Sequence, residues 1–72
     1  MEPVLKNVVA YIKKFKEQNK TDIIYVSDFI KYTKDLYPSD TIEFALEHLE
    51  KDNKIKITRQ YDFPISFEVM DI

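Results

Sequence analysis

The chain has 72 residues, a formal net charge of −2, 44% hydrophobic and 33% charged residues, and neither cysteine nor glycine. This composition predicts one small folded domain over residues 1–72 and excludes a disulfide framework, a thiolate zinc site and a disordered tail. The lack of glycine also excludes phosphate-binding loops of the P-loop and Rossmann types, so we expect neither nucleotide hydrolysis nor a bound cofactor.

The chain shows no targeting or membrane signal. Glu2 and Pro3 stand where a leader would place basic and then hydrophobic residues. The longest apolar runs are far shorter than the about 20 residues of a membrane span. These features predict an intracellular, cytoplasmic protein with no membrane contact.

Residues 3–18 predict the first helix, with Pro3 in the first turn, where proline is tolerated. Apolar residues recur there at three- and four-residue spacing, and they are Val4, Leu5, Val8, Val9, Ile12 and Phe15. The lysines of this segment form either a solvated face or a strip that faces phosphates or acids, and they are Lys6, Lys13, Lys14, Lys16 and Lys20.

Residues 19–22 predict a turn in which Asn19 takes the left-handed conformation. Residues 23–26 are β-branched and aromatic, which predicts a short strand, and Ser27 or Asp28 offers an N-cap for a second helix over residues 28–36. Pro38 ends that helix. Its inward side chains are expected to be Val26, Phe29, Ile30, Thr33 and Leu36 or Tyr37.

A third helix is predicted to begin at Ser39 or Asp40, where Asp40 and Glu43 have capping-box spacing, and to end near Asp52 with Asn53 as a left-handed C-cap. Its buried stripe is Ile42, Ala45, Leu46 and Leu49. Residues 54–58 and 65–69 alternate polar and apolar residues, which predicts a β-hairpin. The inward residues of the hairpin are Ile55, Ile57, Ile65, Phe67 and Val69, and its loop holds Tyr61, Asp62, Phe63 and Pro64.

This order of elements resembles the winged helix-turn-helix superfamily. Residues 39–55 look like that family's third helix running into its first wing strand, through the pattern Thr41, Ile42, Ala45, Leu46, Leu49 and Ile55. The resemblance implies an α+β fold with three helices, a short strand before the second helix and a C-terminal β-hairpin wing. It does not imply a particular function.

The third helix departs from the DNA-binding members of that family. In those members, the positions that match Asp40, Glu43, Phe44 and Glu47 face the major groove and usually carry Arg, Lys, Ser, Gln or Asn. Three of the four are acidic here, and residues 35–52 hold six acids against the one cation Lys51. Carboxylates repel the phosphates on both sides of the groove, so reading of the major groove by this helix is disfavoured.

The Z-alpha branch of the superfamily, which binds left-handed nucleic acid, uses an Asn on the third helix, a Tyr four residues later and a Trp just after the wing proline. The matching positions here are Glu43, Glu47 and, near Pro64, Phe67. The signature is absent, and we do not carry that activity over.

Phe44 lies opposite the buried stripe of the third helix. It is either an anchor for a partner or a residue packed beneath the wing or the first helix. As an anchor it predicts contact with a partner protein or with a second copy of the chain in a homodimer. The candidate protein-interaction residues are Asp40, Glu43, Phe44, Glu47, His48 and Lys51.

The alternative is a DNA- or RNA-binding regulator that uses the wing and the first helix. Cations beside aromatic residues suit contact with phosphates and bases, although lysines also protect exposed strand edges from aggregation. The candidate nucleic-acid-binding residues are Lys13, Lys16, Lys54, Lys56, Arg59 and Tyr61.

Other constellations predict no chemistry. His48 and Asp52 lie one helical turn apart but lack further ligands for a metal, and Glu43 and Glu47 lack the pocket that a catalytic carboxylate pair needs. The three serines lack nucleophile motifs. We therefore expect a non-enzymatic regulatory module, with no metal and no small-molecule substrate, in a transcription, replication or other nucleic-acid-linked assembly.

Overall fold

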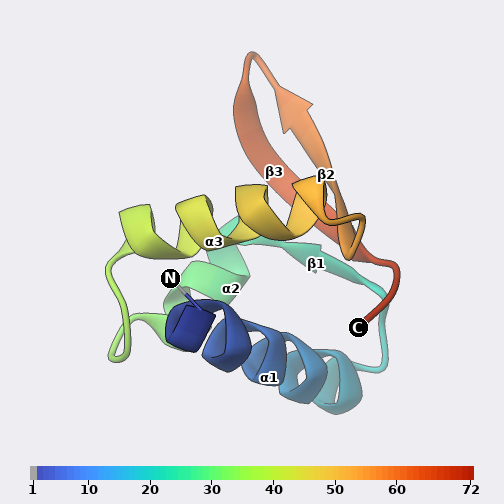
Figure 1. Ribbon diagram of the computed structural model, residues 1–72. Coiled ribbons are helices and arrows are strands. Elements are labelled where there is room, and N and C mark those ends of the chain that lie inside the picture. Colours follow the sequence, from blue (N-terminus) through green and yellow to red (C-terminus); the bar gives the residue numbers. More distant parts are fainter. Residues whose placement is uncertain (1) are drawn as a thin grey trace.

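The computed structural model describes residues 2–72 and consists of three helices and a three-stranded antiparallel sheet (Figure 1). This arrangement confirms the predicted α+β class and the three predicted helices. The elements in chain order are α1 (Glu2–Asn19), β1 (Ile23–Tyr25), α2 (Val26–Thr33), α3 (Ser39–Lys51), β2 (Ile55–Gln60) and β3 (Phe63–Val69).

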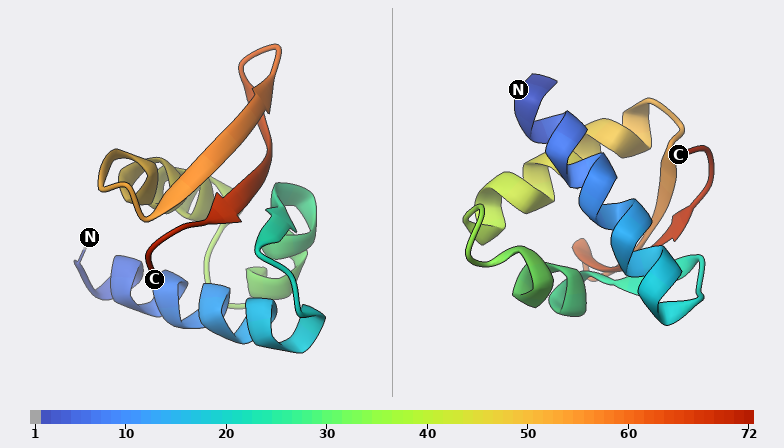
Figure 2. Two further views of the ribbon diagram at one scale, coloured as in Figure 1. Left: turned by 90° about the vertical axis from the view of Figure 1, so that its right-hand side faces the viewer. Right: turned by 90° about the horizontal axis from the view of Figure 1, so that it is seen from below.

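The sheet has the strand order β1-β3-β2, so β3 pairs with both other strands. Phe67 at its centre lies opposite Ile24 on one side and Ile57 on the other. The distal half of the β2–β3 hairpin projects away from the helices, as the left view in Figure 2 shows. The sheet therefore contributes its inner face to the core and leaves the hairpin tip free.

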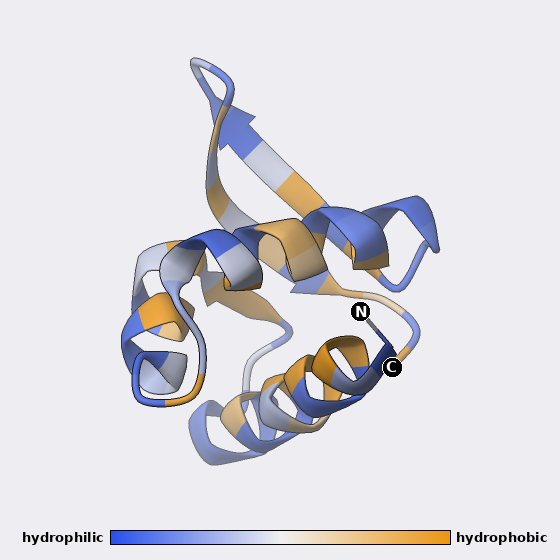
Figure 3. Cartoon of the chain, turned by 60° about the vertical axis from the view of Figure 1, so that its left-hand side comes forward, coloured by the Kyte–Doolittle hydropathy of each residue, from blue (hydrophilic) through white to orange (hydrophobic). Residues whose placement is uncertain are grey.

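The core lies between the three helices and the inner face of the sheet, and the apolar sides of the helices turn toward it (Figure 3). Phe29 of α2 is fully buried and makes edge-to-face contacts with Phe67 and Phe15, with ring centroids 5.6 and 6.2 Å apart. The predicted stripe of α3 is confirmed, because Ile42, Ala45, Leu46 and Leu49 are all buried. Burial of these side chains is the main force that holds the fold together.

The helix ends differ from the predictions in three places. Lys20 (φ 51°), not Asn19, is the left-handed residue after α1, and Asn19 instead donates to the Phe15 carbonyl through its side-chain amide. Tyr25 and Pro38 are the N-caps of α2 and α3, and neither makes a side-chain cap hydrogen bond. The predicted caps at Ser27 or Asp28 and the capping box of Asp40 with Glu43 are therefore wrong.

The observed ends of α2 and the C-terminal end of α3 match the predictions in part. Val26 belongs to α2 and not to the strand, and α2 ends at Thr33, three residues before the predicted end. Leu36 is 46% exposed, whereas the half-buried Tyr37 packs against the core. Asn53 (φ 61°) does end α3 as predicted, because its own N–H and that of Lys54 reach back to the carbonyls of Glu50 and Leu49 in a Schellman motif.

The hairpin turn is tighter than predicted. Tyr61 (φ 52°) and Asp62 (φ 66°) form a two-residue turn, and β3 already begins at Phe63. Thr58 pairs with Ser66 while Arg59 pairs with Pro64, so Ile65 is an extra residue in β3. Such a bulge interrupts the alternation of faces, and Ile65 is 40% exposed instead of buried.

One local contact closes the free edge of β1. Val69 donates to the Asp22 carbonyl, 2.7 Å away, so the backbone groups of Ile23 point away from β3. The Thr21 hydroxyl accepts from the Ile23 N–H and donates to the Ile23 carbonyl, both at 3.1 Å. The outer hydrogen-bonding groups of Ile23 are thus already satisfied within the chain.

Among residues 2–72, no helix combines the length and the apolar character that crossing a lipid bilayer requires.

Candidate functional site

The outer face of α3 carries the exposed aromatic residue Phe44. It lies two positions after the buried Ile42, and at about 100° per residue this places it nearly opposite the core. Phe44 is 59% exposed, so the alternative in which it packs beneath the hairpin or α1 is not observed. Its predicted neighbours Asp40, Glu47, His48 and Lys51 are also exposed, and Glu43 is half-buried. The six candidate protein-interaction residues thus lie along one helix.

Three carboxylates form a row along the side of α3 that is nearest the hairpin. Glu43, Glu47 and Glu50 follow one another at intervals of four and three residues, which places them on one flank of the helix. Glu50 accepts two hydrogen bonds from the Arg59 guanidinium, at 2.8 and 3.0 Å. These bonds lower the pKa of Glu50 and raise that of Arg59, against the opposing effect of partial burial. Arg59 therefore joins the distal part of β2 to α3.

The candidate nucleic-acid-binding residues lie on several elements, and of the six Lys13 and Lys54 line the same pocket. Arg59 is paired with Glu50, Lys16 with Asp22 at 3.1 Å, and Lys54 with Asp71 at 3.9 Å.

The remaining three candidates lie on α1, on β2 and at the hairpin tip. Lys56 lies opposite Glu68 in the sheet, Lys13 lies on α1, and Tyr61 is 87% exposed at the hairpin tip. Three of the six candidates are thus cations held by carboxylates of the same chain.

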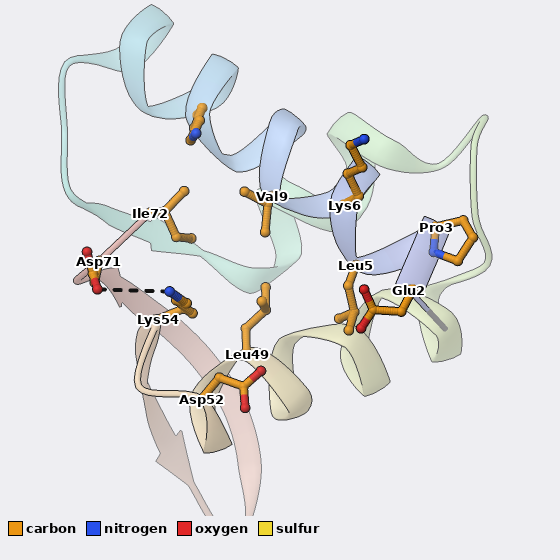
Figure 4. Close-up of a pocket in the computed structure, with 11 residues that line it drawn as sticks. Glu2, Pro3, Leu5, Lys6, Val9, Leu49, Asp52, Lys54, Asp71 and Ile72 are labelled. Carbon is orange, nitrogen blue, oxygen red and sulfur yellow. Dashed lines mark ion pairs between the residues drawn. The ribbon is translucent and has the colours of Figure 1, made fainter.

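A groove of about 870 Å³ was not predicted from the sequence. It lies between α1, the C-terminal end of α3 and the residues after β3, and Figure 4 shows Leu5 and Val9 of α1 on one side of it, with Leu49 and Ile72 on the other. Lys6, Lys13 and Lys54 also line it. Only the folded arrangement brings these segments together, so no local sequence pattern could have indicated the groove.

The pairs His48 with Asp52 and Glu43 with Glu47 lie at one-turn spacing along α3 and its C-cap. His48 Nε2 lies 3.7 Å from Asp52 Oδ2, but within residues 2–72 no three His, Asp or Glu side chains gather where they could hold a metal ion. Glu43 and Glu47 line neither this groove nor the smaller hollow beside Thr21 and Asp22.

In comparisons with known proteins, no family model, no curated protein and no solved structure matches this chain.

Proposed function

We propose that the chain is a small, non-enzymatic winged-helix regulatory module that acts through protein–protein contacts of α3, in an assembly linked to transcription, replication or another nucleic-acid process. The observation that carries the proposal is Phe44, which is 59% exposed beside the carboxylates of Glu43 and Glu47. Aromatic anchors contribute much of the energy of protein interfaces, and a charged rim selects the partner. The partner we infer is a basic protein segment that carries an apolar side chain.

The arrangement of the elements supports the winged-helix part of the proposal. A short strand precedes α2, a short turn joins α2 to α3, and the β2–β3 hairpin follows and projects beside α3 (Figure 1). The short strand joins the hairpin in one sheet, with β3 in the middle. These are the parts that the sequence resemblance implies.

The distribution of charge favours a protein over a nucleic acid as the partner. Affinity for nucleic acid depends on cations that neutralise phosphates. The cations Lys54 and Arg59 are held by Asp71 and Glu50, and the outer face of α3 presents carboxylates. A basic protein segment is attracted by these carboxylates and does not depend on the two paired cations.

The test is a titration of the protein with two labelled probes at low salt. One probe is a synthetic amphipathic helical peptide of lysines with one row of leucines, and the other is a duplex DNA of about 20 base pairs. The proposal expects peptide binding that Phe44→Ala weakens at least about fivefold, which is the effect of losing an interface anchor worth about 1 kcal/mol. It expects no comparable binding of the duplex.

Tyr25→Ala is the matched control, because Tyr25 is also 59% exposed but lies on β1. It should leave peptide binding unchanged. Equal losses in the two variants would mean that Phe44 is not an anchor. Salt-dependent duplex binding that survives Phe44→Ala would instead establish the nucleic-acid alternative.

A further inference from the structure

The groove between α1 and α3 combines an apolar floor with a cationic wall. Val9 and Leu49 form part of the floor, and Lys6 and Lys13 lie three residues before and four residues after Val9 on α1 (Figure 4). Spacings of three and four residues place these lysines on the same side of the helix as Val9. The lysine side of the groove therefore suits an occupant with an apolar group flanked by negative charge.

The charged residues around the groove differ in whether they are already partnered. Lys54 is 3.9 Å from Asp71, whereas Asp52 lies 3.7 Å from His48, which is an ion pair only when that imidazole is protonated. Lys6 and Lys13 are exposed and form no ion pair with any described residue. Glu2 also lines the groove, one turn before Lys6. The cations that remain available for a ligand are thus those of the α1 wall.

The outer face of α3 has the complementary chemistry. Phe44 supplies an exposed aromatic group. Glu43, directly before it, and Glu47, about one turn after it, supply carboxylates. Neither carboxylate forms an ion pair with a described residue. The outer face of α3 therefore carries the apolar and negatively charged groups that the lysine side of the groove is suited to bind.

We propose that the groove binds α3 of a second copy of this chain, with Phe44 over Val9 and Leu49 and with Glu43 and Glu47 against Lys6 and Lys13. The inference rests on the proposed function, because it names the protein that α3 contacts. Phe44 and the groove lie on different faces of the molecule, so the contact is heterologous and adds copies head to tail, in an open chain or a closed ring.

The contact is expected to be weak. A single helix face in a groove of this size falls below the about 1,200 Å² of total buried surface that stable interfaces need. We therefore expect a dissociation constant on the order of 0.1 mM and assembly that weakens as salt screens the charges.

The experiment is sedimentation equilibrium of the full chain over a range of concentrations up to about ten times the expected dissociation constant. The variant F44A lacks the anchor but keeps the groove, and K6E/K13E keeps the anchor but reverses the charge of the groove wall. Both variants change exposed residues, and circular dichroism checks that they fold. K14E/K34E is the matched control, because it makes the same change of charge outside the groove.

The expected result is a mass that rises with concentration beyond two chains for the wild type and for K14E/K34E. F44A and K6E/K13E should each remain at the mass of one chain, and their equimolar mixture should reach the mass of two chains and no more. That mixture offers one intact anchor and one intact groove on different molecules.

Three results would overturn the inference: a wild type that stays at the mass of one chain, a mixture that does not associate, or K6E/K13E that assembles like the wild type. The last would mean that Lys6 and Lys13 take no part in the contact between copies. A failure of this kind is distinct from a failure of the proposed function, which is read from binding of the basic peptide and not from self-association.

Discussion

The ion pair between Glu50 and Arg59 joins the hairpin to α3, and its contribution to stability follows from its geometry. The side chains are 31% and 37% exposed and form two hydrogen bonds. Exposed ion pairs contribute about 0.2–1 kcal/mol, and bidentate ones are the stronger kind. We therefore expect a coupling energy of about 1 kcal/mol between Glu50→Gln and Arg59→Met. A loss of that size lowers the Tm of a domain this small by about 4–8 °C.

The same pair predicts how the coupling depends on pH. Hydrogen bonds from Arg59 lower the pKa of Glu50 in the folded protein from its ordinary value of 4.5. A carboxyl whose pKa is lower when folded stabilises the protein fully above its unfolded pKa, and that contribution is lost as the pH falls through the folded pKa. The coupling should be complete at pH 7 and vanish in strong acid, below the folded pKa of Glu50.

The assay is a double-mutant cycle by urea unfolding at pH 7 and again in strong acid. The control cycle uses Lys16 and Asp22, which share one contact at 3.1 Å with side chains 43% and 62% exposed, and it should give about 0.3 kcal/mol or less. A coupling of zero between Glu50 and Arg59 at pH 7, or one that persists unchanged in acid, would refute the reasoning.

Two further predictions concern the core and the hairpin turn. Phe29→Ala should lower the free energy of unfolding by about 3–5 kcal/mol, because Phe29 is fully buried against Phe15, Tyr32 and Phe67. Urea unfolding would measure the loss, and a change below about 1.5 kcal/mol, the usual limit for volume-conserving core swaps, would mean that the site collapses around the missing ring. The double variant Y61N/D62G should raise the free energy of unfolding by about 1 kcal/mol, which is measured as a higher urea midpoint. The reason is that Tyr61 and Asp62 both have positive φ, and Asn-Gly is the favoured pair in such turns. An unchanged midpoint would show that the turn residues are not under conformational strain.

The helices were predictable where hydrophobic periodicity is strong. In α1 and α3 the apolar residues recur on one face over four and three turns, and their bounds were predicted within one or two residues. The ends were harder because the caps use no side-chain bond: Pro38 ends the turn before α3 by its fixed φ, and Lys20 takes a conformation usually given to glycine or asparagine.

The candidate site was predictable only in part. The exposure of Phe44 follows from its position opposite the stripe of α3, which the sequence contains. The pairing of Arg59 with Glu50 depends on the register of the hairpin and on the bulge at Ile65, and the groove depends on how α1 packs beside α3. These relations join residues distant in sequence, so local patterns carry no signal for them.

The Thr21 hydroxyl protects one edge of the sheet, at β1, from pairing with a strand of another molecule. A strand from another molecule could extend the sheet at β1 only by first breaking both hydrogen bonds between Thr21 and Ile23. Sheet extension is the route by which small β-containing proteins convert to fibrils. The self-association proposed through Phe44 would join side chains and would leave both of these hydrogen bonds intact.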